Sequence, residues 1–137
     1  RAAGRGGRAV KRTFLYAKVH RAHVTEANLE YEGSLTLDQD LMDAAGFREY
    51  ERIDVWTVTN GNRFSPYLIN GPRGRGDCCI NGAAAHLCRA GDRVIIAAFC
   101  DLEVAEIERH EPRVVLIKGA SNLDYVVKNA ETAHTVP

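Results

Sequence analysis

Residues 53–69 read IDVWTVTNGNRFSPYLI, and this stretch decides the fold class. Ile53 to Thr59 is rich in β-branched and aromatic residues, which favour strands. The pair Asn60-Gly61 that follows is a strong signal for a hairpin turn. Phe64 to Ile69 is then expected to return as the partner strand. Pro66 is out of place in that strand, because proline has no N–H to donate to a neighbouring strand.

The rest of the chain repeats this pattern of short strands and tight turns. Asp38 is expected to cap a short helix that ends at Gly46. Residues 81–86 read as a turn that leads into a small helix, and residues 102–110 as a short acidic helix. Residues 93–100, RVIIAAFC, form an apolar run that indicates a strand buried on both faces. Further strands are expected at 13–20, 29–37 with an interruption at Gly33-Ser34, 78–80 and 114–118. The sequence therefore predicts a mainly β fold, a small barrel of six or so strands with short helices.

Length and composition indicate one domain. The chain has 137 residues, of which 45% are hydrophobic, enough for a single core. We expect a disordered extension at 1–11, the barrel at 12–118 and a C-terminal tail at 119–137. The formal net charge is +0, which argues against nucleic acid as the main partner. No apolar run reaches the roughly 18 residues of a membrane helix, so no membrane partner is expected.

The cysteines bear on location and on metals. Cys78, Cys79, Cys88 and Cys100 do not form the dense pattern of a small secreted protein, so we interpret them as free thiols of a cytoplasmic protein. The spacing of Cys79, His86 and Cys88 does not match a common zinc motif. No metal site is therefore expected.

Gly33-Ser34 in LEYEGSLTLDQD, residues 29–40, raises a chemical possibility. A serine hydroxyl can attack the preceding carbonyl and convert the amide into an ester. Glycine tolerates the strained backbone this requires. Elimination and hydrolysis would then leave a pyruvoyl group on Ser34, a ketone that forms a Schiff base with an amino acid. A bulge or turn is the structural alternative at this position.

Four other positions carry similar alternatives. Lys18 and Arg63 could each hold a carboxylate, or could be solvated surface charges. Tyr67 could donate a proton or pack as a strand aromatic. The small residues of NGAAAH, residues 81–86, could admit a ligand to backbone amides or could serve close packing.

Taken together, four segments resemble the bacterial aspartate 1-decarboxylase family. They are KVHRAHVTEANLEYEGSLTLDQDLMDAAG, VWTVTNGNRF, INGAAAHL and GDRVIIAAF, and the match is collinear over residues 12–118. The resemblance implies a six-stranded double-psi β-barrel and a homotetramer with active sites between subunits. It also implies self-cleavage between Gly33 and Ser34, with a pyruvoyl group derived from Ser34 as the cofactor. The implied reaction is decarboxylation of L-aspartate to β-alanine, which serves pantothenate synthesis.

The same resemblance implies roles for individual residues. Arg63 and Lys18 would each hold one carboxylate of a small amino-acid substrate. Tyr67 would return a proton after carbon dioxide leaves. Asn81 and the backbone amides near Ala83 and Ala84 would line the site. His20 and Trp56 would lie at the edge of the pocket.

Pro66 departs from the family, which places a threonine there. That threonine hydroxyl is thought to stabilise the oxyanion of the cleaved glycine, and proline offers neither a hydroxyl nor an N–H. Three alternatives stay open: Ser65 or a water substitutes, a maturation helper protein is needed, or the chain is an uncleaved, non-catalytic homologue. A further alternative is a same-fold decarboxylase for a different amino acid in secondary metabolism.

Overall fold

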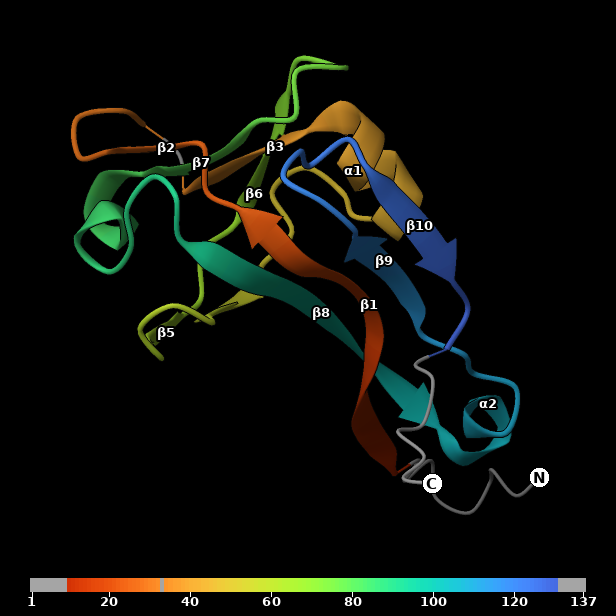
Figure 1. Cartoon of the computed structure of the whole chain (residues 1–137). Coiled ribbons are helices and arrows are strands. Elements are labelled where there is room, and N and C mark those ends of the chain that lie inside the picture. Colours follow the sequence, from red (N-terminus) through yellow and green to blue (C-terminus); the bar gives the residue numbers. More distant parts are fainter. Residues whose placement is uncertain (1–9, 33, 131–137) are drawn as a thin grey trace.

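The computed structural model describes residues 10–32 and 34–130, and the strands among them form two sheets (Figure 1). The six-stranded sheet has the order β10 (Tyr125–Lys128), β9 (Arg113–Ile117), β1 (Lys11–His23), β8 (Arg93–Glu103), β4 (Asp54–Thr57), β5 (Arg63–Phe64). The four-stranded sheet has the order β2 (Glu26–Asn28), β7 (Cys78–Asn81), β3 (Leu35–Asp38), β6 (Leu68–Gly71). The prediction of a mainly β fold is confirmed.

Strands β1 and β8 form a long antiparallel pair in the six-stranded sheet (Figure 1). It runs from Lys11 opposite Glu103 to His23 opposite Arg93, with two irregularities in β1. At the second of these Arg21 has a φ of 68°, and the Arg93 guanidinium donates two hydrogen bonds to the Arg21 carbonyl. Strand β9 pairs with β1 in parallel and β10 pairs with β9 antiparallel.

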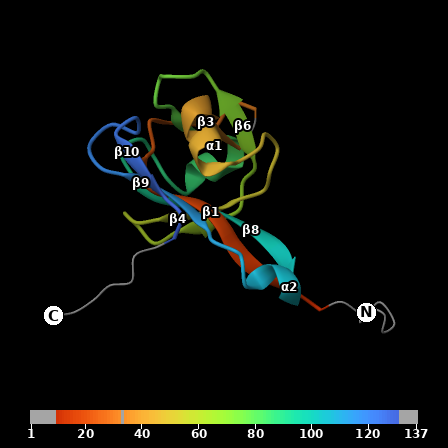
Figure 2. The ribbon, with the colours of Figure 1, turned by 90° about the vertical axis from the view of Figure 1, so that its right-hand side faces the viewer.

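In the four-stranded sheet, β3 pairs with β6 in parallel although β4 and β5, which come between them in the chain, belong to the other sheet. Strands β2 and β7 are a second parallel pair. The chain thus crosses repeatedly between the two sheets, and both sheets contribute to one core. In Figure 2, β3, β6 and α1 lie together at the top, and β1 and β8 extend away from them toward α2. This arrangement is consistent with the predicted barrel.

Three short helices complete the described chain. Helix α1 (Gln39–Ala45) is as predicted: the Asp38 carboxylate accepts from the Asp40 N–H at 2.7 Å, and Gly46 ends the helix with a φ of 80°. The 3-10 helix η2 (Gly82–His86) follows β7 directly, also as predicted. Helix α2 (Val104–Ile107) is shorter than the predicted segment 102–110, because β8 continues through Glu103.

The predicted strand at 64–69 is wrong as a single element. Strand β5 pairs with β4, whereas β6 pairs with β3 in the other sheet, so the chain changes sheets between them. Pro66 lies at this change, is buried, and accepts at its carbonyl from the Ile53 N–H at 3.0 Å. Because Pro66 belongs to neither named strand, its missing N–H leaves no gap in the ladders of β5 and β6.

Three other sequence predictions need correction. The segment 29–37 is not one interrupted strand, since residues 29–30 form a turn between β2 and β3, and Gly33 lies outside the described residues. Strand β8 is not buried on both faces, since Phe99 is 39% exposed. Residues 114–118 do not hold the last strand, because β10 follows. Within residues 10–32 and 34–130, none of the helices has the length and apolarity that a membrane crossing requires.

Candidate active site

Ser34, Tyr67 and Asn81 come from three distant segments and lie side by side at one end of the four-stranded sheet, where Ser34 directly precedes β3, Tyr67 directly precedes β6 and Asn81 ends β7. The Asn81 N–H donates to the Ser34 carbonyl at 2.8 Å, and the N–H of Leu35 donates to the Tyr67 carbonyl at 3.0 Å. In the register of β3, Leu35 lies between Ile80 and Leu68. One position earlier, Ser34 therefore lies between Asn81 and Tyr67, and we call these three residues the serine row.

The serine row lies on the face of the sheet that points away from the core. Leu35, Leu68 and Ile80 are fully buried, and side chains alternate between the two faces of a strand. The neighbouring positions, which form the serine row, therefore point the other way. Exposure falls along the row, from Tyr67 at 40% through the half-buried Ser34 to Asn81 at 4%. The row is thus open to solvent at its tyrosine end and closed at its asparagine end.

Asn81 carries an unused acceptor at the closed end. Its Nδ2 donates to the Thr36 hydroxyl at 3.2 Å, whereas its buried Oδ1 has no hydrogen-bond partner among the described residues. A buried carbonyl oxygen without a donor is costly, so this atom suits a donor on a ligand or on the chain around Ser34. Beyond Asn81, in η2, Ala84 packs against the core while Ala83 is exposed.

The position next to the row offers no hydroxyl. Pro66 directly precedes Tyr67, and the Ser65 hydroxyl donates to Asp54 Oδ1 at 2.7 Å. Because Asp54 lies on β4, in the other sheet, this bond holds the Ser65 side chain toward that sheet. The geometry gives no support to Ser65 as a substitute for the threonine of the family.

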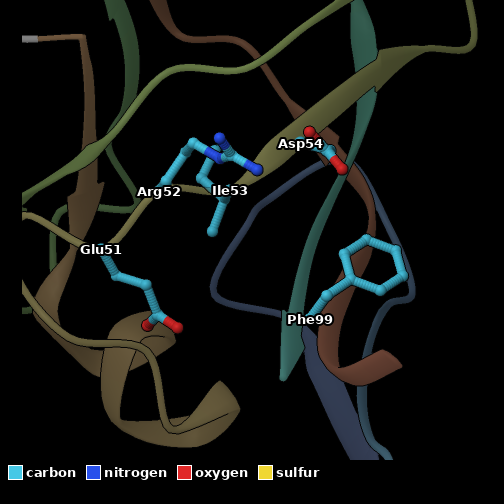
Figure 3. A pocket seen from close by; sticks show the side chains of 5 residues that line it. All are labelled: Glu51, Arg52, Ile53, Asp54 and Phe99. Atoms are coloured by element: carbon cyan, nitrogen blue, oxygen red, sulfur yellow. The ribbon is translucent and has the colours of Figure 1, made fainter. Parts of the chain in front are cut away.

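A cavity of about 240 Å³ lies between Asp54 and Phe99 on one side and Glu51 on the other (Figure 3). Its carboxylates are already engaged. Asp54 accepts from Ser65, and Glu51 accepts from the Tyr16 hydroxyl. Burial and this bond to Glu51 raise the pKa of Tyr16. None of the sequence-predicted site residues lines this cavity, so we place the candidate site at the serine row.

The predicted cations lie in the six-stranded sheet. Arg63 on β5 is opposite Trp56 on β4, and its guanidinium carbon is 5.0 Å from the centre of the Trp56 ring, a cation–π contact. Lys18 on β1 is opposite Ala97 on β8. Their neighbours Ala17, Val19 and Val55 belong to the core. Because side chains alternate between the two faces of a strand, four predicted site residues lie on the sheet face opposite the core, which we call the outer face: Lys18, His20, Trp56 and Arg63.

The structure therefore brings together only part of the predicted site. Ser34, Tyr67 and Asn81 meet, with Ala84 and Ala83 following Asn81 in η2. Lys18, His20, Trp56 and Arg63 lie in the other sheet. Gly33, the other side of the predicted cleavage point, lies outside the described residues.

Two residues that contact the serine row, Thr36 and Tyr50, were not predicted from the sequence. Thr36 binds the Asn81 amide, and its place two residues after Ser34, on the same face of a strand, could have indicated it. Tyr50 contacts the Tyr67 ring, with 6.3 Å between ring centroids. No sequence signal pointed to Tyr50, because the contact depends on a turn that only the folded backbone reveals.

The four cysteines are free. Burial raises the pKa of Cys78, and it raises the pKa of Cys88 to about 11, so both thiols stay protonated at neutral pH. Cys78 packs in the core as a small apolar side chain. Among the described residues no His, Cys, Asp and Glu side chains gather in a way that could hold a metal ion.

Comparison with known proteins assigns the chain. The family model described as aspartate decarboxylase matches residues 10–124. The aspartate 1-decarboxylase of Syntrophobacter fumaroxidans is 54% identical over 110 residues, covering 80% of this chain and 89% of the relative. That of Neisseria meningitidis is 49% identical over 125 residues, covering 91% and 98%. That of Caldicellulosiruptor saccharolyticus is 52% identical over 103 residues, covering 75% and 80%. The chain belongs to the aspartate decarboxylase family.

Proposed function

We propose that this protein decarboxylates L-aspartate to β-alanine and carbon dioxide with a pyruvoyl group derived from Ser34. The observation that carries the proposal is the serine row, which places a candidate proton donor and a buried acceptor on either side of Ser34. The relatives named aspartate 1-decarboxylase support the substrate. When formed, the pyruvoyl ketone would condense with the substrate amine and withdraw electrons from it.

The proposed function requires self-cleavage between Gly33 and Ser34. In the proposed step the Ser34 hydroxyl oxygen bonds to the Gly33 carbonyl carbon, the peptide C–N bond breaks, and the nitrogen of Ser34 takes up the proton. Elimination releases the new C-terminal carboxylate, and hydrolysis of the remaining dehydroalanine releases ammonia and leaves the ketone. The Asn81 N–H holds the Ser34 carbonyl throughout, so the new end stays anchored in the sheet.

Tyr67 is the proposed proton donor. Its carbonyl accepts from the N–H of Leu35, so its backbone is fixed next to Ser34, while the residue is 40% exposed and therefore accessible to substrate. The Tyr67 hydroxyl would return a proton to the carbon that carbon dioxide leaves. Arg63 and Lys18 would hold the two carboxylates of the substrate as fixed cations.

The placement of Lys18 and the serine row in different sheets supports a site shared between copies. Lys18, His20 and Trp56 lie on the outer face of the six-stranded sheet, whereas Ser34 lies in the other sheet. We therefore propose a homotetramer in which the outer face of one copy completes the serine row of a neighbouring copy. A cytoplasmic location is also proposed, supported by the four free thiols.

Pro66 sets the expected rate of cleavage. Because the Ser65 hydroxyl is bound to Asp54, the oxyanion of Gly33 would depend on a water or on a maturation helper protein. Cleavage of the purified chain is therefore proposed to be slow. Replacing Pro66 with threonine should accelerate it.

The test is the intact mass of purified protein, fresh and after warm incubation. The proposal predicts two fragments, 1–33 and 34–137, with a pyruvoyl mass at the start of the larger one. Carbon dioxide release from a panel of amino acids then identifies the substrate, and preference for another acid would favour the alternative decarboxylase. A chain that stays uncut in both wild type and Pro66→Thr would favour the non-catalytic homologue.

A further inference from the structure

Tyr50 occupies a turn position that tyrosine does not favour. The Glu51 N–H donates to the Arg48 carbonyl at 3.1 Å and closes a turn in which Tyr50 is the third residue, with a φ of 70°. Positive φ at this place normally selects glycine or asparagine, since a bulky side chain is strained there. Tyr50 is 71% exposed, so burial in the core does not account for a tyrosine there either.

Arg21, the other non-glycine residue with positive φ among the described residues, shows a different cause. It sits at an irregularity of β1, and the Arg93 guanidinium binds its carbonyl at 3.1 and 2.9 Å. The bonds that stabilise this backbone conformation are made to the Arg21 carbonyl and do not involve the Arg21 side chain. At Tyr50 the feature to explain is the side chain itself.

The ring of Tyr50 contacts the ring of Tyr67, with centroids 6.3 Å apart and planes tilted by 35°. The backbones are linked as well: the Tyr50 N–H donates to the Leu68 carbonyl at 2.7 Å, and the Leu68 N–H donates to the Glu51 carbonyl at 3.0 Å. Among the described residues, no side chain is hydrogen-bonded to the Tyr67 hydroxyl, and the Tyr50 ring is the aromatic group in contact with the Tyr67 ring.

We propose that Tyr50 is a positioning residue for Tyr67, an inference that rests on the proposed function. Proton transfer requires the donor to be held at a fixed distance and angle from the reacting carbon. The backbone bond to Leu35 fixes the root of the Tyr67 side chain, and the Tyr50 ring fixes its χ angles. The strained turn is retained because it presents the Tyr50 ring to Tyr67.

The test compares Tyr50→Asn with Tyr50→Phe in the cleaved enzyme. Asparagine tolerates the positive φ but removes the ring, so Tm should stay unchanged or rise. The kcat for β-alanine formation should fall about tenfold with KM unchanged, since a positioned proton donor contributes about 10²–10⁴ in rate and only its orientation is impaired. Tyr50→Phe keeps the ring and should retain wild-type kcat. Tyr31→Asn, at another exposed tyrosine, is the matched control and should change neither value.

Each outcome decides between the two proposals. Wild-type kcat in Tyr50→Asn would overturn the role of Tyr50 while leaving the proposed function intact. If fully cleaved wild type forms no β-alanine, the proposed function fails, and the ring contact is then judged by NMR. The Tyr67 ring signals, assigned by their loss in Tyr67→Phe, should shift in Tyr50→Asn and stay in place in Tyr31→Asn. If the Tyr67 ring signals do not shift in Tyr50→Asn, the inference is overturned independently of any activity measurement.

Discussion

The two sheets hold their functional side chains in different ways. In the four-stranded sheet, backbone hydrogen bonds fix Ser34 between Asn81 and Tyr67 within one chain. Lys18 and Arg63 belong instead to the six-stranded sheet, on its outer face. Under the proposed function, self-cleavage uses the serine row and not the outer face, whereas substrate binding uses both. The two activities should therefore be separable by mutation.

The largest effect is expected at Ser34. Ser34→Ala removes the attacking hydroxyl and with it the source of the ketone, so both cleavage and β-alanine formation should be lost. Intact mass and carbon dioxide release measure the two. Ser65→Ala is the matched control, because the Ser65 hydroxyl is bound to Asp54, and this variant should cleave like wild type. Cleavage of Ser34→Ala would refute the assignment of the attacking group.

Lys18→Gln should separate self-cleavage from decarboxylation. The variant should cleave normally, because Lys18 is not in the serine row, but carbon dioxide release should fall about a hundredfold from the loss of a charge-assisted bond to a carboxylate. Lys11→Gln, at an exposed position of the same strand, should behave like wild type.

Co-expression of Lys18→Gln with Ser34→Ala tests whether the site is shared. An intact outer face on the Ser34→Ala copy should complete the cleaved serine row of the Lys18→Gln copy, so activity should reappear in the mixture. A mixture as inactive as its two components would place Lys18 and Ser34 of one chain in the same site.

Asn122 connects the end of β1 to the loop before β7 and should affect stability rather than chemistry. Its side chain accepts from the His23 N–H at 2.8 Å and donates to the carbonyls of His23 and Gly76, both at 2.9 Å, with 3% exposure. Asn122→Ala leaves these buried groups unpaired, so the free energy of unfolding in urea should fall by about 3 kcal/mol. Asn129→Ala, at an exposed residue, is the control. A loss below roughly 0.5 kcal/mol, the range of ordinary surface changes, would contradict this role.

The smallest effect is the acid dependence of Asp38, in the four-stranded sheet. Burial alone would raise its pKa, but N–H donors including Gly76 at 2.6 Å and Asp40 at 2.7 Å outweigh it, so the pKa is lowered from 3.8. Because the folded pKa lies below the unfolded one, the carboxylate stabilises the fold at pH above the unfolded value, and this is lost as pH falls through the folded value.

Asp38→Asn tests that dependence. The stability difference between wild type and the variant should be constant from neutral pH down to about pH 5 and should shrink below about pH 4. Urea unfolding at several pH values measures it, with the exposed Glu108→Gln as the control. A difference that grows as the pH falls would mean that the Asp38 pKa is raised in the folded protein.

Some of the site was accessible from sequence because it depends on neighbouring residues. Gly33-Ser34 raised the cleavage chemistry by direct adjacency, and the resemblance supplied roles for Tyr67 and Asn81 by position. The sequence could not show that Tyr67 and Asn81 flank Ser34, since that depends on two strand pairings between segments more than 30 residues apart. Nor could it show that Lys18 lies in the other sheet.

The features that could be predicted from the amino-acid sequence alone are local ones. Asp38 and Gly46 set the ends of α1, because a cap is satisfied by residues one turn away. Asn60-Gly61 turned the chain between β4 and β5, where Gly61 adopts a φ of 80°. Only the folded chain shows where the segment 64–69 divides, what surrounds Ser34, and that the Tyr50 ring contacts the Tyr67 ring. Each of these depends on burying one common core between two sheets, and that burial outweighs the preference of any short stretch of chain.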